Sequence, residues 1–480
     1  MLNDLKNVRK KIFVVPLRTE GEIWYSIRNK YERVVEMKVK PPFGRLVAPI
    51  GLLLATVAVQ AADFNVRDFG AKGDGGTKDT VAVQSAIDAA ASKGGGRVVL
   101  SDGVFLSGAL RLKSGVELHV DRTAKLLASP DILDFPDFPD GHTRRENLPR
   151  QRNVAFIFAD EAERIAITGF GTIDCNGKFH IREKSDPDWK CWRYERVHPM
   201  TNTLPRVVFF AGCRDAVVRD VTMTGQPAGW SYWIHDCDRV QMTGLKILAN
   251  VRYPNNDGIH VNCSRDVTVS DCIIETGDDS IVVRANSRSL KENKPCERVV
   301  VNNCTLRSWS SGIRIGWIDD GVIRDCIFSN LAMHDTSVGV SVNLPKRRNK
   351  PGWTDYGREA TKVENLLFSN IRMNGIYARP VLITTVPEEA GTHVAGIRDL
   401  RFTNIHATGL EFPLLEGREG CPIENIVFSG CSFRRVAESA LPEDWRRHGY
   451  AVNDRRPDDQ YLTRHARGVR FNDTVFDYVY

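Results

Sequence analysis

The hydrophobic and polar positions alternate in short runs through most of the chain. Stretches such as "DAVVRDVTMTG" from residue 215 and "RDVTVSDCII" from residue 265 are built from alternating apolar residues. Such alternation is typical of half-buried β-strands. Each run begins at a polar turn and ends at a corner of Ser, Thr, Asn, Gly or Asp, after which a second short strand follows. The pattern therefore predicts many short strands with no long helix between them.

This strand–corner–strand unit recurs along the chain. Its copies start near residues 215, 238, 265, 297, 321, 363, 397, 423 and 468. The closest copies lie roughly twenty residues apart, and a period of about 20 to 50 residues indicates a solenoid. Short strands without intervening helices favour stacked coils joined by parallel ladders. We therefore predict an all-β fold, a right-handed parallel β-helix.

One stretch has helical rather than strand periodicity. "DTVAVQSAIDAAASKGGG" is amphipathic, opens with Asp79 as a carboxylate N-cap and ends in glycines. We expect an N-terminal capping helix that covers the first coil and protects its open sheet edge. The preceding "GAKGDGG" lacks the Lys-Ser/Thr ending of a phosphate loop, so a plain turn is expected. Three irregular stretches, 129–152, 176–204 and 342–358, are expected to form loops that wall a groove.

The N-terminal part carries a candidate export signal. Residues 37–62 combine three basic residues with an apolar run from Leu46 to Val59 and a small-residue cleavage pattern. The run is short for a membrane span. We interpret 37–62 as a signal peptide, 1–36 as a mis-called or disordered extension, and 63–480 as one catalytic β-helix domain; an internal anchor is the alternative. The signal predicts a secreted or periplasmic protein with no membrane span in the mature chain.

Composition narrows the function classes. The chain is 42% hydrophobic and 26% charged with a net charge of +6, which is typical of a soluble globular protein. Nucleic-acid binding is not indicated, while an acidic substrate is allowed. There is no CxxC pair and no His cluster with zinc spacing, so we expect no metal. We also expect no cofactor and a monomeric protein. Most of the eleven cysteines lie in strand-like runs as packing groups, and Cys421 with Cys431 is a candidate bridge.

Three carboxylates stand in strand-like sequence that has no structural need for them. Asp257 lies in "NNDGI", and Asp278 and Asp279 lie in "TGDDSI", which begins one coil later. The separation is close to the shortest coil, and residues one coil apart stack about 4.8 Å apart on parallel strands. Asp257 and Asp278 should therefore project from the same face. Gly277 indicates a corner that lets Asp279 reach the same groove.

This crowding points to acid–base chemistry. Neighbouring carboxylates repel one another, and the least solvated of them is pushed to a higher pKa. The difference supplies an acid and a base at one pH, which cleavage of a glycosidic bond needs. Asp clusters also form plain turns and calcium sites, so spacing alone leaves those alternatives open. A second pair, Asp319-Asp320, lacks a carboxylate one coil earlier and serves as an internal comparison.

The two acidic motifs resemble those of glycoside hydrolase family 28, the polygalacturonases and their relatives. "NNDGI" is similar to the family's Asn-Thr-Asp-Gly motif and "TGDDSI" to its Gly-Asp-Asp motif, while residues 64–87 look like the opening coil of pectin-active β-helices. The resemblance covers nearly all of the predicted mature chain. It implies an inverting hydrolase in which Asp278 is the general acid, Asp257 and Asp279 hold the attacking water, and Asn255 contacts the substrate. Stacking on adjacent coils, however, suggests a carboxylate separation nearer the range of retaining enzymes.

The sequence departs from the family at two motifs. Where the family has Gly-His-Gly, "SWSSGIRIG" places Ser310 or Ser311 at the position of the histidine. Where the family has Arg-Ile-Lys, "VGVSVNL" carries Ser341 and Asn343. Arg binds a carboxylate through a bidentate fork that Ser and Asn cannot reproduce. Arg314, within the first stretch, is our candidate for supplying the charge, and an outward-facing strand residue is the alternative.

A few further residues have both a functional and a packing interpretation. Tyr377 in "NGIYARP" resembles a family tyrosine near the cleaved bond, although a tyrosine wedged in a solenoid wall is the commoner arrangement. Trp230 and Trp233 could stack on sugar rings or pack in the core. Arg284 is a weaker candidate than Arg314 for binding a substrate carboxylate.

The sequence therefore favours an exported, polygalacturonase-like hydrolase that cleaves α-linked galacturonide bonds in an acidic, plant-type pectin polysaccharide. A related pectic specificity, such as rhamnogalacturonan, is an alternative because the Arg and Lys are replaced. A β-elimination lyase would need a basic residue and often calcium. A carbohydrate-binding solenoid that has lost catalysis would have little use for three crowded acids.

Overall fold

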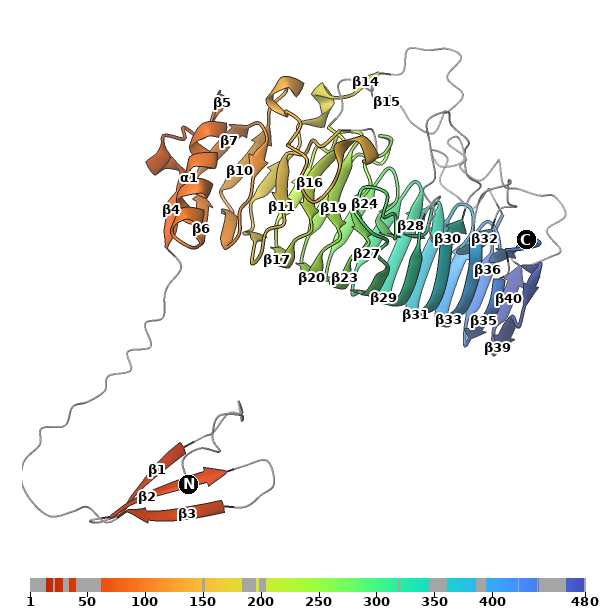
Figure 1. The fold of residues 1–480 in the computed structure, drawn as a ribbon. Coiled ribbons are helices and arrows are strands. Elements are labelled where there is room, and N and C mark those ends of the chain that lie inside the picture. The colour runs from red at the N-terminus through yellow and green to blue at the C-terminus, as the bar shows by residue number, and fades with distance from the viewer. Residues whose placement is uncertain are drawn as a thin grey trace, which may run out of the picture. The chain divides into compact units, whose positions relative to one another are not determined.

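The chain divides into two units, Met1–Gln60 and Ala61–Tyr480 (Figure 1). The structure is a computed structural model that describes residues 14–19, 22–28, 34–39, 62–148, 152–183, 196–197, 204–317, 320–344, 361–385, 394–421, 423–437, 439 and 463–478. The first unit contains an antiparallel sheet of β1 (Val14–Thr19), β2 (Glu22–Arg28) and β3 (Val34–Val39). The apolar run of the predicted signal lies outside the described residues.

One sheet of the second unit carries the acidic motifs at its strand starts. It is an 11-stranded sheet, and its neighbouring strands are parallel. Its members are β8 (Leu110–Arg111), β11 (Ile157–Asp160), β16 (Arg206–Ala211), β19 (Trp230–His235), β22 (Ile259–Asn262), β25 (Ile281–Arg284), β28 (Ser311–Ile315), β30 (Val338–Leu344), β32 (Val381–Thr385), β34 (Leu414–Glu416) and β37 (Thr463–Arg464).

The remaining faces of the coils form a 24-stranded parallel system. Its members are β4 (Asp63–Asn65), β5 (Asp74–Lys78), β6 (Gly96–Leu100), β7 (Gly103–Ser107), β9 (Val116–Val120), β10 (Ala124–Ala128), β12 (Ala166–Thr168), β13 (Thr172–Asp174), β17 (Arg214–Arg219), β18 (Thr222–Thr224), β20 (Asp238–Thr243), β21 (Lys246–Leu248), β23 (Arg265–Ser270), β24 (Ile273–Thr276), β26 (Cys296–Asn302), β27 (Thr305–Ser308), β29 (Val322–Thr336), β31 (Thr361–Ile376), β33 (Val394–Gly409), β35 (Ile423–Ser429), β36 (Ser432–Arg435), β38 (Ala466–Arg467), β39 (Arg470–Asn472) and β40 (Val475–Tyr478). Short elements outside these sheets are η1 (Val66–Phe69), η2 (Ile132–Asp134), η3 (Arg145–Asn147), η5 (Gly177–Phe179) and the antiparallel pair β14 (Arg182–Glu183) and β15 (Arg196–Val197).

The coils stack in register, so identical residue types form columns inside the solenoid. Phe328, Phe368, Phe402 and Phe428 are paired on successive strands. Their rings stack with centroids 4.9, 4.6 and 4.6 Å apart. Inward positions of the alternating pattern thus supply one continuous apolar core along the coils. The predicted right-handed parallel β-helix is confirmed.

Corner residues in the left-handed conformation separate the strands of a coil. Asn330, Asn370 and Asn404 form one column of corners with φ of 55°, 56° and 54°. Asn370 Nδ2 donates to Asn330 Oδ1 at 3.1 Å, and Asn404 Nδ2 donates to Asn370 Oδ1 at 2.8 Å. Short polar side chains tolerate this backbone better than other non-glycine residues. The polar corners of the repeat are therefore the points where the chain turns.

The predicted capping helix is present as α1 (Thr80–Ser92), which packs an apolar face on the first coils. Asp79 is the N-cap residue of this helix, as expected, but its carboxylate makes no hydrogen bond to the start of the helix. Its oxygens instead accept from the backbone N–H groups of Lys72 at 2.6 Å and Gly73 at 2.9 Å. Asp79 therefore fastens the glycine-rich turn to the helix.

All ten cysteines in the described part of the chain are buried free thiols. The candidate bridge between Cys421 and Cys431 is therefore wrong. Cys431 Sγ instead approaches the backbone oxygens of Phe402 at 3.5 Å and Ser429 at 3.4 Å inside the solenoid. Within the described residues, no helix combines the length and hydropathy that a membrane crossing requires.

Of the three stretches expected to wall a groove, 129–152 is described almost completely, and it includes η2 and η3. Most of 176–204 and of 342–358 lies outside the described residues.

Candidate active site

The acidic motifs lie at the starts of two neighbouring strands. Ile259 of β22 pairs with Ile281 of β25, and Gly258 N–H donates to Asp279 O at 2.9 Å. This register sets Asp257 beside Asp279, whereas the sequence prediction aligned it with Asp278. The coil is one residue longer than that prediction assumed, and Asp278 directly precedes the aligned position.

All three carboxylates nevertheless meet. One oxygen each from Asp257, Asp278 and Asp279 lies within 4.8 Å of the others. Asp257 is 5% exposed, while the other two are half-buried. Asp257 is therefore the least accessible of the three carboxylates, and Asp278 and Asp279 are the two that solvent can reach. The expected convergence of these side chains is observed.

The backbone around the carboxylates is tightly fixed. Asn256 Oδ1 accepts from Gly277 N–H at 2.7 Å and from Asp278 N–H at 3.3 Å. A Cβ at Gly277 would lie 2.1 Å from Tyr253 O, so another residue would not fit. A Cβ at Gly258 would meet Ser280 O at 2.2 Å. Both glycines therefore permit the close backbone approach that brings the acids together.

His260 is a site residue that sequence reasoning missed. Its Nε2 lies 2.9 Å from Asp257 Oδ2, and its ring stacks on Trp230 with centroids 4.0 Å apart. Burial, reinforced by the charge of Arg284, lowers the pKa of His260 to about 3 against the opposing effect of Asp279. The ring is therefore neutral at pH 7 and holds Asp257 by a hydrogen bond rather than an ion pair. The only feature of the sequence that could have pointed to His260 is its position three residues after Asp257, at the beginning of β22.

Two of the predicted substrate-binding positions contact the carboxylates directly. Asn255 Nδ2 donates to Asp278 Oδ2 at 3.4 Å, and Ser311 N–H donates to Asp279 Oδ1 at 2.9 Å. Ser310 is buried beside them, and its N–H donates to Ser308 Oγ at 2.8 Å. Asn255 and Ser311 therefore belong to the cluster, and Ser310 supports its backbone.

The predicted cation lies beside the replaced motif. Arg314 of β28 pairs in register with Ser341 of β30, and its guanidinium lies 4.3 Å from the Trp317 ring centroid. Arg314 Nη2 and Asn343 Oδ1 are buried atoms without a hydrogen-bond partner in the described part of the chain. Arg284 is committed elsewhere, because Asp320 accepts from its Nε at 2.7 Å and its Nη2 at 2.8 Å.

The predicted aromatic residues separate into two environments. Tyr377 is buried, donates its hydroxyl to Asp335 Oδ1 at 3.1 Å and packs in an apolar cluster with Trp309 and Leu382. Trp233 is buried between Phe209 and other rings. Trp230 is half-buried against His260. Of these rings, Trp230 is therefore the one placed beside the carboxylates.

The same three carboxylates could also hold a cation. Hard divalent cations prefer carboxylate oxygens at short distances. No other group of three or more His, Cys, Asp or Glu ligands comes together in the described residues. A cation and an acid–base pair would compete for the same oxygens.

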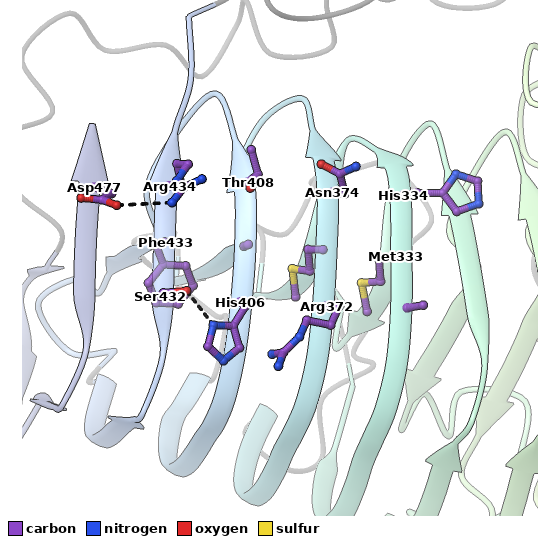
Figure 2. Close-up of a pocket in the computed structure, with 13 residues that line it drawn as sticks. Met333, His334, Arg372, Asn374, His406, Thr408, Ser432, Phe433, Arg434 and Asp477 are labelled. Atoms are coloured by element: carbon purple, nitrogen blue, oxygen red, sulfur yellow. Dashed lines mark hydrogen bonds and ion pairs between the residues drawn. The ribbon is translucent and has the colours of Figure 1, made fainter. Parts of the chain in front are cut away.

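A hollow of about 550 Å³ lies on a different face, across β29, β31, β33 and β36 (Figure 2). Arg372 and His406 line it, and Arg434 pairs with Asp477 at 3.7 Å. His406 Nδ1 forms a hydrogen bond of 2.7 Å with Ser432 Oγ. The hollow contains no pair of carboxylates, so it does not offer the acid–base chemistry of the Asp257 site.

A model of the family described as Glycosyl hydrolases family 28 matches residues 97–439, which include both acidic motifs. The chain belongs to glycoside hydrolase family 28. The expected family, and with it the glycoside hydrolase class, is confirmed. A second model, described as rhamnogalacturonase A/epimerase, pectate lyase-like, matches residues 64–125 at the first coils of this family 28 chain.

Individual relatives are distant. A probable polygalacturonase of Vitis vinifera is 27% identical, and the match spans 60% of this family 28 chain but only 58% of the relative. A polygalacturonase of Malus domestica is 28% identical over 66% of this chain and 70% of its own length. The solved structure of a hyperthermoactive exopolygalacturonase from Thermotoga maritima has a TM-score of 0.61 at 24% identity, covering 78% of this chain and 87% of that one. The structural likeness supports the β-helix fold.

Proposed function

We propose that this chain hydrolyses α-linked galacturonide bonds in pectin-type polysaccharide. The observation that carries the proposal is the meeting of Asp257, Asp278 and Asp279, with oxygens within 4.8 Å, inside the region matched by family 28. The names of the grape and apple relatives supply the substrate class. A cleaved glycosidic bond needs a proton for the leaving oxygen and an activated water, and such a cluster supplies both.

The proposed roles are those that the resemblance to family 28 implies. Asp278 gives its proton to the glycosidic oxygen, and the bond from that oxygen to the anomeric carbon breaks. A water held by Asp257 and Asp279 forms the new bond from the opposite face and loses its proton to one of them. His260 and the Ser311 N–H donate to Asp257 and Asp279 respectively, which stabilises negative charge on the two bases.

We propose Arg314 as the contact for a substrate carboxylate, with Asn343 and Ser341 as polar neighbours. Arg284 is a poorer candidate because Asp320 already engages its guanidinium. A buried guanidinium nitrogen without a partner gains a strong charge-assisted bond when a carboxylate arrives. Tyr377 then contributes to the wall of the solenoid rather than to the substrate.

A related pectic specificity, such as rhamnogalacturonan hydrolysis, is the second candidate. The observation that favours it is Ser341 and Asn343 in β30, which bear no charge where the family motif has Arg and Lys. Incubation with polygalacturonate and with rhamnogalacturonan, followed by product identification, separates the two specificities.

We also infer export, with residues 37–62 as the signal, so that hydrolysis takes place in the periplasm or outside the cell. The basic and apolar pattern of these residues supports this inference.

The test of the proposed function is the substitution Asp278→Asn. We expect loss of reducing-end release from polygalacturonate with an unchanged melting temperature, because the amide keeps the shape but cannot donate a proton to the leaving oxygen. Asp271→Asn is the matched control, because Asp271 is an exposed corner residue with φ of 58°, a conformation that Asn also adopts.

An Asp278→Asn enzyme that cleaves as fast as the parent contradicts the assigned acid. Proton NMR of the first product tests the stereochemistry, and a β-anomer is expected. An α-anomer would contradict the inverting mechanism. Inverting enzymes usually have roughly 6.5 Å or more between the carboxyl groups. The nearest oxygens of the three carboxylates here lie within 4.8 Å, so the stereochemistry of the product tests the proposed roles directly.

A further inference from the structure

A row of outward side chains leads along the 11-stranded sheet to the carboxylates. Arg206 of β16 pairs in register with Trp230 of β19. Tyr232 of β19 pairs with Ile259 of β22. Two residues earlier on each strand, this register aligns Trp230 with Asp257. Neighbouring strands lie about 4.8 Å apart, so Arg206 is two strand spacings and Trp230 one spacing from Asp257. Arg206 and Trp230 are therefore the two strand positions that a substrate would reach on the N-terminal side of Asp257.

Aromatic rings fill the outward face on that side. Phe138 stacks on Phe158 at 4.4 Å, Phe158 contacts Phe209 at 5.1 Å, and Phe209 stacks on Trp233 at 4.5 Å. Leu148 packs in the same cluster. Phe158, Phe209 and Trp233 are at most 4% exposed. A polysaccharide therefore cannot lie on the outward faces of β11, β16 and the second half of β19.

Arg206 completes this closure. Its side chain is fully buried, with the guanidinium 4.6 Å from the Trp233 ring centroid. Its Nη1 donates to Arg152 O at 2.7 Å. The buried guanidinium is therefore held by a ring and a backbone oxygen, so the row is blocked two strands before Asp257.

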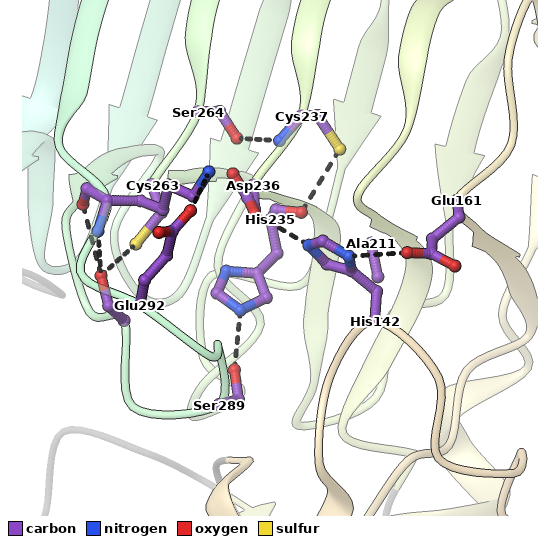
Figure 3. A network of polar contacts seen from close by, with 12 residues as sticks. His142, Glu161, Ala211, His235, Asp236, Cys237, Cys263, Ser264, Ser289 and Glu292 are labelled. Atoms are coloured by element: carbon purple, nitrogen blue, oxygen red, sulfur yellow. Dashed lines mark hydrogen bonds and ion pairs between the residues drawn. The ribbon is translucent and has the colours of Figure 1, made fainter.

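Residues 135–148, which we name the closing segment, are fastened over these rings. His142 lies between Asp236 and Glu161, with Nε2 2.8 Å from Asp236 Oδ2 and Nδ1 3.3 Å from Glu161 Oε1 (Figure 3). A Cβ at Gly212 would lie 2.7 Å from the His142 ring, so the glycine provides its seat. Asn153 Nδ2 donates to Phe138 O at 3.1 Å. The segment is therefore built into the fold.

One strand spacing remains between the closed part and the catalytic acids. Trp230 occupies it, half-buried and stacked flat on His260. A spacing of about 4.8 Å is close to the length of one pyranose ring, and an indole face is a common platform for a sugar. On the N-terminal side of the carboxylates, only this one strand position lies outside the buried rings and Arg206, and its width is about that of a single sugar.

We propose that the enzyme attacks the end of its polysaccharide chain and releases one sugar at a time. The inference rests on the proposed function and adds its mode of attack. The terminal sugar occupies the space beside Trp230, where the closing segment, Arg206 and Trp233 stop the chain from continuing. Each turnover consumes one water, breaks the outermost glycosidic bond and yields a monosaccharide and a polymer shortened by one unit.

The first experiment follows products of the wild-type protein on polygalacturonate. We expect monogalacturonate as the first product, with reducing ends rising while viscosity stays nearly constant. Early oligomers of several sizes with a steep fall in viscosity would overturn the proposal while leaving the hydrolase function intact. If a folded protein releases nothing from any pectic substrate, the proposed function fails, and the mode of attack fails with it.

The second experiment opens the closed side by Phe138→Ala, alone and combined with Leu148→Ala. We expect the share of oligomers among the products to rise at least severalfold. Phe170→Ala removes a ring that is 61% exposed elsewhere and should keep the monosaccharide pattern. A folded, active double variant that still releases only monosaccharide would show that the closing segment does not limit chain entry. If the double variant does not fold, the single variant and the wild-type products decide.

Discussion

At the scale of single residues, several polar side chains of the site already have partners. Arg284 is held by Asp320, and His260 is held by Asp257. Arg314 instead rests on Trp317, beside Ser341, and one of its buried nitrogens has no partner in the described residues. A guanidinium in that state has most to gain from an arriving carboxylate.

Replacing Arg314 by Gln should therefore weaken substrate binding. We expect KM for polygalacturonate to rise about tenfold or more with a smaller change in kcat, because a charge-assisted hydrogen bond is worth about 1.5–3 kcal/mol. Steady-state kinetics on defined oligogalacturonates measure the split. Arg372→Gln, at an exposed arginine in the hollow of Figure 2, should leave KM unchanged. An unaltered KM in the Arg314 variant would exclude it from the binding site.

The sequence predicted the meeting of the three acids because the separation of their two motifs is close to one coil, and stacked coils bring such residues together. It could not predict His260 as their partner. Alternation along a strand shows that a side chain points inward or outward, but not which neighbour it meets. The same limit hid the bond between Arg284 and Asp320, because these residues lie on segments that only the folded coil brings together.

At the scale of elements, stability depends on columns that repeat from strand to strand. The phenylalanine column from Phe328 to Phe428 continues to Phe471, with a last centroid distance of 5.0 Å. Each ring contacts the coil before and the coil after, so one residue contributes to two interfaces. The asparagine corners likewise connect one coil to the next, through hydrogen bonds between their side-chain amides.

Phe402→Ala should therefore be strongly destabilising. Phe402 is fully buried and stacks on both Phe368 and Phe428. We expect the free energy of unfolding to fall by about 3–5 kcal/mol, the usual cost of truncating a core phenylalanine. Urea denaturation measures the change, with Phe179→Ala as an exposed control expected within about 0.5 kcal/mol of wild type. A loss below about 1 kcal/mol would mean that the column is not a stabilising unit.

At the scale of the whole molecule, buried histidines make folding depend on pH. Burial lowers the pKa of both His235 and His260 to about 3, while an unfolded histidine titrates near 6.5. As pH falls below about 6.5 the unfolded chain takes up protons that the folded protein does not. The free energy of unfolding therefore decreases from about pH 6.5 down to about pH 3.

The substitution His235→Gln should flatten this dependence. One such histidine accounts for about 2 kcal/mol of lost stability between pH 7 and pH 5. Gln can keep a hydrogen bond to Ser289, which lies 2.7 Å from His235 Nε2. Denaturation curves at the two pH values measure the difference. Equal pH dependence in wild type and variant would mean that folding does not lower the pKa of His235.

The fold as a whole was predictable because the coils repeat one sequence pattern, a polar corner followed by a strand of alternating apolar and polar residues. The loops between coils do not repeat, so their packing was not predictable. Residues 129–152 were expected to wall a groove, but the filling of that groove depends on contacts such as Phe138 on Phe158. Asp79 shows the same limit at one position, because the glycine-rich turn competes with the helix for its carboxylate.

The sealed thiols have a practical consequence. The ten cysteines in the described part of the chain are buried and form no disulfide bond, so the described coils are held together without oxidation. Each of these sulfurs becomes reactive only when its own coil opens. The rate of alkylation at each position, read by mass spectrometry, would therefore map where the solenoid begins to unravel.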